Sequence, residues 1–228
     1  SVALAGLPVT LVESNFCDLP EVLAQLDVPA VDGILLDLGL SSDQLADSDR
    51  GFSFSGDGPL DLRFDPTRGE PTWRLVNRLG EKNLADLIYA YGEERFSRRI
   101  ARAIVAQRQK SEIRTAAELA ELIRRNVPRQ RHERIDPATR TFQALRIASN
   151  EELKSLDIAL RRLPDCLRQG GRLAIISFHS LEDRRVKEAF RDDPRCHVLT
   201  KKPIRPKDEE IERNPRARSA KLRVAARA

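Results

Sequence analysis

The chain has 228 residues, of which 40% are hydrophobic, so it is long enough for one core with room for a second lobe. No stretch approaches the ~18–20 apolar residues of a membrane-spanning helix, and the N-terminal SVALAGLPVT lacks the flank and apolar run of a signal peptide. We therefore predict a globular cytoplasmic protein without a membrane partner. The 40 Lys and Arg outnumber the 35 Asp and Glu, which gives a net charge of +5.

The positive charge is concentrated in three segments: ERFSRRIARAIVAQRQK (94–110), KKPIRPK (201–207) and NPRARSAKLRVAARA (214–228). Clusters of this kind indicate a polyanionic partner such as nucleic acid. The alternative is a solvated basic helix face with a charged tail.

The cysteines and histidines do not predict a metal site. Cys17, Cys166 and Cys196 are odd in number and show no metal-binding spacing, and the three histidines are scattered. We expect reduced, structural cysteines and no metal.

The first forty residues predict two β–α steps. A strand is expected over 8–14 (PVTLVES), followed by a helix over 19–28 that Asp18 can cap. A second strand is expected over 33–39 (GILLDLG), whose consecutive apolar residues are typical of a parallel sheet covered on both faces. This end of the chain therefore has an α/β character.

A long loop rich in Gly, Pro, Asp and Ser follows from about residue 45, and loops of this length are usually functional. Apolar residues at helical spacing then predict a mostly helical lobe: Leu84, Leu87, Ile88 and Tyr91; Phe96, Ile100, Ala103 and Ile104; Leu119, Leu122 and Ile123.

The α/β pattern then returns. One helix is expected over 139–163, a strand over 172–179, a helix over 181–192, and closing strands over 197–204 and 220–227. We predict a discontinuous α/β domain (1–44 and 140–228) that is interrupted by a long loop and a helical insertion (45–139).

Asp37 follows the apolar run of the second predicted strand, near the strand end where open α/β sheets bind ligands. It could instead cap the following loop. Together with Phe16 and Gln44 it could form the walls of a site for a purine or another flat polar ring. Ser177, His179 and Ser180 would lie on the same rim, but without a GxSxG elbow this Ser/His pair does not favour a hydrolase.

Six segments closely resemble one bacterial family: DGILLDLGLSSDQL, RGFSFSGDGPLDLRFDPTRG, YGEERFSRRIARAIV, PATRTFQALRI, GGRLAIISFHSLEDRRVK and NPRARSAKLR. The resemblance is to the small-subunit ribosomal RNA cytosine-N4 methyltransferases of the MraW/RsmH type. It runs from about residue 9 to the C-terminus, with the segments in the same order.

The resemblance implies a Rossmann-like class I methyltransferase domain with an inserted helical substrate-recognition domain. It implies S-adenosylmethionine as cofactor, methyl transfer to N4 of a cytidine in the decoding region, and cofactor contacts from Phe16, Asp37 and Gln44. The implied partner is small-subunit ribosomal RNA or the assembled small subunit, and a homodimer is possible. The alternative is a non-catalytic RNA-binding or ribosome-assembly protein.

Candidates for the chemistry are Asp37, Ser41 and Ser42, which lie where acceptors for the target amine are needed. His179 could orient the base, accept a proton, or simply hydrogen-bond the backbone. Glu182 and Asp183 begin the next helix, where the helix dipole alone favours carboxylates.

Candidate RNA contacts are arginines and a lysine in the helical lobe and near the C-terminus: Arg95, Arg98, Arg99, Arg102, Arg140, Arg146, Arg216, Arg218, Lys221 and Arg223. The first four would face away from Phe96, Ile100 and Ile104. Arg140 and Arg146 could instead bridge the insertion to the sheet.

The sequence departs from the family pattern in two places. The glycine-rich cofactor loop and the ribose-binding acid that open the family's domain are not in this chain, so an incomplete cofactor pocket is expected. The GxG at Gly56–Gly58 lies in the long loop and is no substitute. Asp136 stands where many members have a histidine before PATRTFQ.

Overall fold

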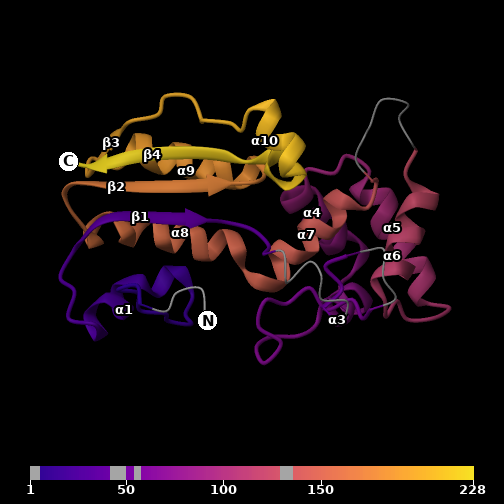
Figure 1. Ribbon diagram of the computed structural model, residues 1–228. Coiled ribbons are helices and arrows are strands. Elements are labelled where there is room, and N and C mark those ends of the chain that lie inside the picture. The colour runs from indigo at the N-terminus through magenta and orange to yellow at the C-terminus, as the bar shows by residue number, and fades with distance from the viewer. Residues whose placement is uncertain (1–5, 42–49, 54–57, 129–135) are drawn as a thin grey trace. The chain divides into compact units, whose positions relative to one another are not determined.

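A computed structural model describes residues 6–41, 50–53, 58–128 and 136–228 (Figure 1). The chain forms two compact units, each with its own core. Unit 1 comprises Ser1–Gly39 and Leu153–Ala228, and unit 2 comprises Leu40–Glu152. No helix within the described ranges is both long enough and apolar enough to cross a membrane.

Unit 1 is built on a mixed sheet of four strands in the order β1-β2-β4-β3. The strands are β1 (Val31–Asp37), β2 (Leu167–Ser177), β4 (Lys221–Arg227) and β3 (Cys196–Val198). β1 and β2 are parallel, whereas β4 is antiparallel to both β2 and β3. The predicted parallel pair and the predicted strand at the C-terminus are confirmed.

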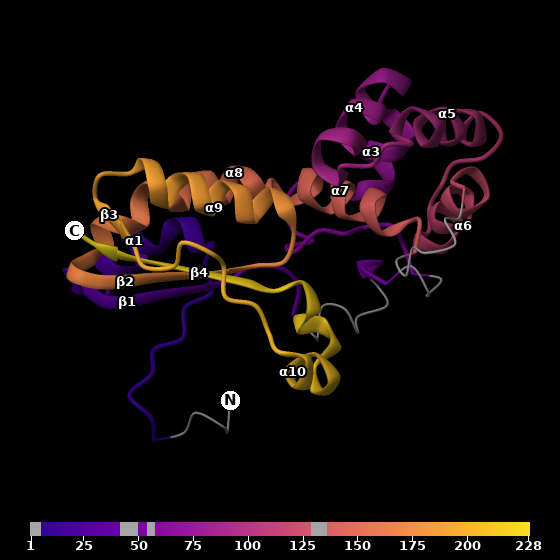
Figure 2. The ribbon, with the colours of Figure 1, turned by 90° about the horizontal axis from the view of Figure 1, so that it is seen from above.

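Helices α8 (Glu152–Arg162) and α9 (Ser180–Asp192) lie on one side of this sheet (Figure 2). Successive side chains of a strand point to opposite faces. Ile34 and Leu36 are accordingly buried in the core that contains residues of both helices, while Leu35 between them is 65% exposed. The prediction that β1 is covered on both faces is therefore wrong for the described residues.

The segment before β1 forms a 3₁₀ turn (Phe16–Asp18) and helix α1 (Leu19–Gln25). The strand predicted over 8–14 is absent from the described structure. Leu11 is 70% exposed, and the segment's backbone pairs with none of the four strands of the sheet. High β propensity does not make a strand without a neighbour to complete its hydrogen bonds. Asp18 stands at the N-cap of α1 but makes no side-chain cap bond, whereas Asn15 caps the preceding 3₁₀ turn by accepting from the Cys17 amide at 3.1 Å.

The last part of unit 1 differs from the prediction in its details. β2 begins at Leu167, before the expected Arg172, and follows a 3₁₀ turn over Leu163–Cys166. The strand expected over 197–204 is reduced to β3 and one isolated bridge between Ile204 and Leu222. Two short elements were not predicted, α10 (Asp208–Arg213) and a 3₁₀ turn (Pro215–Ser219).

Unit 2 is helical, as predicted. Its helices are α3 (Thr72–Arg78), α4 (Glu81–Gly92), α5 (Ser97–Arg108), α6 (Ala116–Asn126) and α7 (Thr139–Asn150). α4 packs against both α5 and α7. The buried core of the unit includes Leu84, Ile88, Ile100, Ile104, Leu119, Ile123 and Leu145.

The long loop that precedes α3 contributes apolar side chains to the core of unit 2. Leu60 and Leu62 are almost completely buried, and the rings of Phe52 and Phe64 stack with centroids 5.9 Å apart. Phe54 lies outside the described residues. Apolar anchors therefore order a segment whose composition is otherwise typical of a surface loop.

The single helix predicted over 139–163 is two helices, α7 and α8, separated by Glu151 in the left-handed conformation (φ 49°, ψ 35°). Asn150 fixes the end of α7: its side-chain oxygen accepts from the Phe64 amide at 2.7 Å, and its amide group donates to the Leu62 carbonyl at 2.7 Å. These contacts come from residues far away in the sequence, so helical periodicity could not reveal the break. α7, which the sequence-based boundaries gave to the α/β domain, packs in unit 2.

We predict that Gly92→Ala destabilises unit 2. A Cβ at Gly92 would overlap the carbonyl of Arg140, where the end of α4 meets α7. Overpacking against backbone typically costs about 1–3 kcal/mol. Chemical denaturation monitored by circular dichroism measures this loss. The control is Gly80→Ser at the start of the same helix, where a Cβ meets no atom within 4 Å; equal stability of the two variants would contradict the predicted overlap.

Candidate active site at the carboxyl edge of the sheet

The parallel pairing of β1 and β2 brings two of the sequence motifs to one edge of unit 1. Asp37 is the register partner of Ile176, and the Leu38 amide donates to the Ile176 carbonyl at 3.0 Å. One residue later, Gly39 has a φ of 107°, and a Cβ there would lie 3.2 Å from the Phe178 ring. The DLG and SFHS segments therefore meet where parallel sheets bind ligands.

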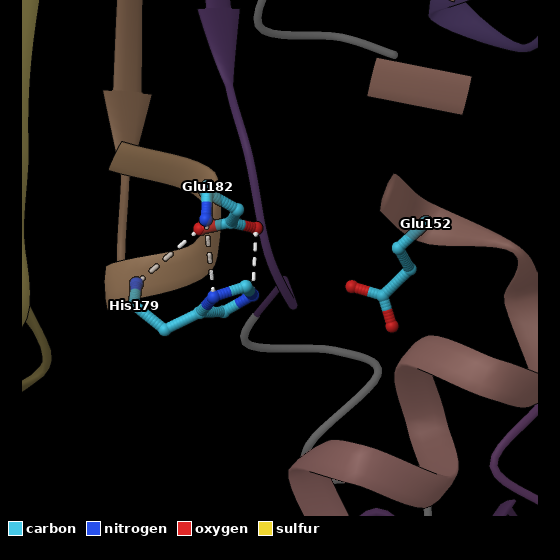
Figure 3. Close-up of side chains that lie close together, drawn as sticks. All are labelled: Glu152, His179 and Glu182. Carbon is cyan, nitrogen blue, oxygen red and sulfur yellow. Dashed lines mark hydrogen bonds and ion pairs between the residues drawn. The ribbon is translucent and has the colours of Figure 1, made fainter. Parts of the chain in front are cut away.

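His179 and Glu182 form a capping box at the start of α9 (Figure 3). The Nδ1 atom of His179 accepts from the Glu182 amide at 3.4 Å. In return, Oε2 of Glu182 accepts from the amides of Phe178 at 2.8 Å and His179 at 3.3 Å. The reciprocal bonds satisfy amides that a helix start otherwise leaves without partners.

The other ring nitrogen of His179 is buried without a hydrogen-bond partner among the described residues. Nε2 lies 3.2 Å from Oε1 of Glu182, but this contact lacks the direction of a hydrogen bond, so it is an electrostatic contact only. The side chains of His179 and Glu182 are only 9% and 5% exposed.

Asp183, the next residue on α9, is held by β4. Its carboxylate accepts from Nε of Arg223 at 2.7 Å and lies 3.4 Å from Nζ of Lys221. Burial by itself raises the pKa of Asp183, but the hydrogen bond and charge of Arg223, helped by Lys221, outweigh it and hold the pKa below its usual 3.8. Asp183 therefore fastens α9 to the sheet as a carboxylate, beyond the helix-dipole role expected from the sequence.

The remaining predicted site residues are only partly described. Phe16 is half-buried against the core of unit 1, and Asp37 and Ser41 are exposed. Ser177 is buried, and its hydroxyl donates to the Lys221 carbonyl at 3.4 Å. Ser42 and Gln44 lie outside the described residues.

The predicted basic stripe occupies the exposed side of α5 and the turn before it. Arg98, Arg99 and Arg102 are exposed, while Ile100 and Ile104 on the opposite side are buried in unit 2. Arg95 lies over the Phe96 ring, with its guanidinium carbon 4.6 Å from the ring centroid.

Three other candidate RNA contacts are engaged within their own units. Arg146 donates two hydrogen bonds to Glu152, at 2.8 and 2.9 Å, and its side chain is 15% exposed; Figure 3 also draws Glu152, which belongs to unit 2. Arg223 is 6% exposed beneath Asp183, and Lys221 contacts the same carboxylate. Because Arg146 and Arg223 are buried and paired with carboxylates of the protein, they are poorly placed to contact RNA phosphates as predicted.

Arg140, Arg216 and Arg218 are exposed at the surfaces of their units. Their predicted role in RNA binding is compatible with these positions. Asp136, the residue that departs from the family pattern, binds the Ala138 amide at 2.9 Å and pairs with Arg124 at 2.8 Å. An aspartate at this position therefore orders the entry to α7.

Sequence reasoning missed the structural importance of Glu182. The signal was present, because HSLE has the spacing of a capping box with histidine in place of serine or threonine. Asp183 could not have been paired with Arg223 from the sequence, since 39 residues separate them and only the position of β4 beside β2 brings them together.

The sequence profile of the MraW methylase family matches residues 4–228. The chain belongs to this family. The recognition from six motifs is thereby confirmed, as is the prediction of a Rossmann-like α/β methyltransferase fold. Membership in a methylase family implies S-adenosylmethionine as the methyl donor.

Curated relatives are similar over most of this chain. The Ribosomal RNA small subunit methyltransferase H of Rhodopirellula baltica is 58% identical over 210 residues, which are 91% of this chain and 65% of the relative. The proteins of the same name from Sorangium cellulosum and a Cyanothece strain are 52% and 54% identical, over 99% and 97% of this chain. The chain spans 72% of the length of each of these two relatives.

The described part of the edge fits a flat, polar cofactor. The exposed carboxylate of Asp37 can accept hydrogen bonds, and Phe16 offers an aromatic surface. Gly39, with its positive φ, lets the backbone pass close to the Phe178 ring. Carboxylates and aromatic rings are residue types suited to binding an adenosine-containing molecule.

We predict that Asp183→Asn lowers the free energy of unfolding by about 3 kcal/mol at neutral pH, because it leaves the buried Arg223 uncompensated. The folded-state pKa of Asp183 lies below 3.8, so the contribution of the ion pair is complete above that value and is lost as the pH falls through the folded pKa. The stability gap between the wild type and the variant should therefore close in acid.

Urea denaturation at a series of pH values measures this gap. The matched control is Asp192→Asn, which removes an exposed ion pair with Arg191 from the same helix and should change stability little. A gap that does not narrow at all as the pH falls below 3.8 would contradict the proposed origin of the stabilisation.

Proposed function

We propose that the protein transfers the methyl group of S-adenosylmethionine to the exocyclic N4 of a cytidine in the decoding region of small-subunit ribosomal RNA. The observation that carries this proposal is the meeting of the DLG and SFHS segments at one edge of the sheet in a chain that belongs to a methylase family. The relatives' name, which specifies small-subunit ribosomal RNA, supports the substrate class.

The chemical problem is the weak nucleophilicity of the cytosine amine, whose lone pair is delocalised into the ring. The bound cofactor supplies an activated methyl group, and the protein must hold the amine about 3 Å from that carbon and in line with the leaving sulfur. We assign Asp37 the role of accepting a hydrogen bond from N4 and stabilising the positive charge that develops there. Ser41, four residues later, is a further candidate acceptor.

RNA binding is assigned to the exposed side of α5. Arg98, Arg99 and Arg102 present positive charge on a helix whose other side is anchored in the core. Arg102 has only a loose, exposed contact with Glu81 at 3.6 Å, which competes little with a phosphate. Arg140, Arg216 and Arg218 extend the proposed RNA contacts. The possible homodimer remains a prediction.

The proposal is tested with isotope-labelled S-adenosylmethionine and small ribosomal subunits, followed by nucleoside mass spectrometry. We expect N4-methylcytidine as the product. Asp37→Ala should weaken cofactor binding in calorimetry by about 1–3 kcal/mol, the cost of removing one hydrogen bond to a ligand, and should lower the methylation rate.

Ser14→Ala is the control, because Ser14 is exposed and hydrogen-bonds only its neighbour Asn15. Tight RNA binding with no methyl transfer would instead support the non-catalytic RNA-binding alternative. Unchanged cofactor affinity in Asp37→Ala would remove this residue from the site.

We predict that replacing Arg95, Arg98, Arg99 and Arg102 together with Gln weakens RNA binding without affecting the fold. Replacing an arginine that binds a phosphate should make the plot of log affinity against log salt less steep by about 0.7–0.9, because fewer counterions are released on binding. Filter binding or fluorescence anisotropy at several salt concentrations measures the slope.

The control variant removes the same charge from other exposed positions of unit 2, through Arg78→Gln, Lys82→Gln, Lys110→Gln and Arg125→Gln. A general loss of positive charge would affect both variants equally. An identical salt slope in the α5 variant and the wild type would mean that the stripe contacts only water.

A further inference from the structure

The capping box at α9 determines which nitrogen of His179 carries the proton. Nδ1 accepts a hydrogen bond from the Glu182 amide, so it must have a free lone pair. A neutral imidazole with an unprotonated Nδ1 carries its hydrogen on Nε2. In this arrangement His179 is a donor through Nε2 and has no free lone pair with which to accept a proton.

This donor has no acceptor in the described structure. Nε2 is buried, and the nearby Oε1 of Glu182 lies out of line for a hydrogen bond. Buried polar atoms without a partner are rare in folded proteins and call for an explanation, because leaving a donor unsatisfied costs free energy. An acceptor atom of a ligand at this edge of the sheet would remove that cost.

Asp37, on the neighbouring strand, offers a hydrogen-bond acceptor. Its carboxylate is exposed and can only accept hydrogen bonds at neutral pH. Parallel strands lie about 4.8 Å apart, and His179 follows the register partner of Asp37 by three residues, a path of at most about 11 Å. The two side chains therefore stand at or just after the ends of neighbouring parallel strands, at the same carboxyl edge of the sheet.

We propose that Asp37 and His179 together select cytosine, with the carboxylate accepting from N4 and the Nε2–H group donating to the ring nitrogen N3. Cytosine presents a donor at N4 beside an acceptor at N3, whereas uracil presents an acceptor at O4 beside a donor at N3. The pair thus matches cytosine and opposes uracil at both positions. This inference rests on the proposed function, and it makes His179 a donor that positions the base, not its general base.

The tautomer is tested without any activity measurement. Nitrogen-15 NMR of protein labelled at histidine should show His179 with a bare Nδ1 and a protonated Nε2 at neutral pH, with the signals assigned by their loss in His179→Asn. A hydrogen on Nδ1 would overturn the inference, because the cap and the donor would both be misassigned.

The contact with N3 is tested by a double-mutant cycle, in which one substitution is made in the protein and the other in the RNA base. His179→Asn retains a good helix cap, because asparagine is among the preferred N-cap residues, but removes the Nε2 donor. The base change replaces the target cytidine with 3-deazacytidine, in which N3 is a C–H group. Any intrinsic change in the reactivity of N4 affects both proteins equally, so it cancels in the cycle.

We expect kcat/KM on the natural RNA to fall about tenfold to hundredfold in His179→Asn, the usual range for removing one hydrogen bond to a ligand. Replacing the target with 3-deazacytidine should lower kcat/KM of the wild type, and this loss should exceed the loss in the variant by about tenfold to hundredfold. Both proteins should keep the same melting temperature. Equal impairment of both proteins would overturn the contact. A wild type that methylates no cytidine would instead refute the proposed function.

Discussion

The in-register parallel pairing of β1 and β2 is the constraint on which the candidate site depends. It places Asp37 opposite Ile176 and so joins two motifs that are about 140 residues apart in the sequence. Of the residues between them, Leu40–Glu152 form unit 2, which folds around its own core. A register shift of one residue would move Asp37 away from the edge and turn Ile34 and Leu36 out of the core.

Polar contacts then fix the start of α9 against that edge. The capping box uses the side chains of His179 and Glu182 to satisfy each other's backbone amides, and Asp183 binds Arg223 on β4. Because these side chains are largely buried, each is held in one arrangement. A side chain held in this way can present a donor at a defined position, which a solvent-exposed histidine cannot do.

Unit 2 uses its arginines in two different ways. Arg146 is held by Glu152 and Arg124 by Asp136, and both pairs order the two ends of the segment around α7. The arginines of α5 instead remain exposed on a helix that Ile100 and Ile104 anchor. Only the second group has the accessibility that phosphate recognition requires, although both groups look alike in composition.

Local chemistry in the sequence determined the family, the α/β and helical character of the two parts, and most helices. Helices α4, α5, α6 and α9 were predictable because their apolar spacing coincides with the side that is buried. Asp37 was identified as a site candidate because a carboxylate stands at the end of a β-strand. What failed were features set by distant partners, namely the exposed segment 8–14, the break at Glu151 and the pairing of Asp183 with Arg223. Only the tertiary structure decided these, because a strand needs a neighbouring backbone, a helix end needs the residues that bind it, and an ion pair needs both charges in one place.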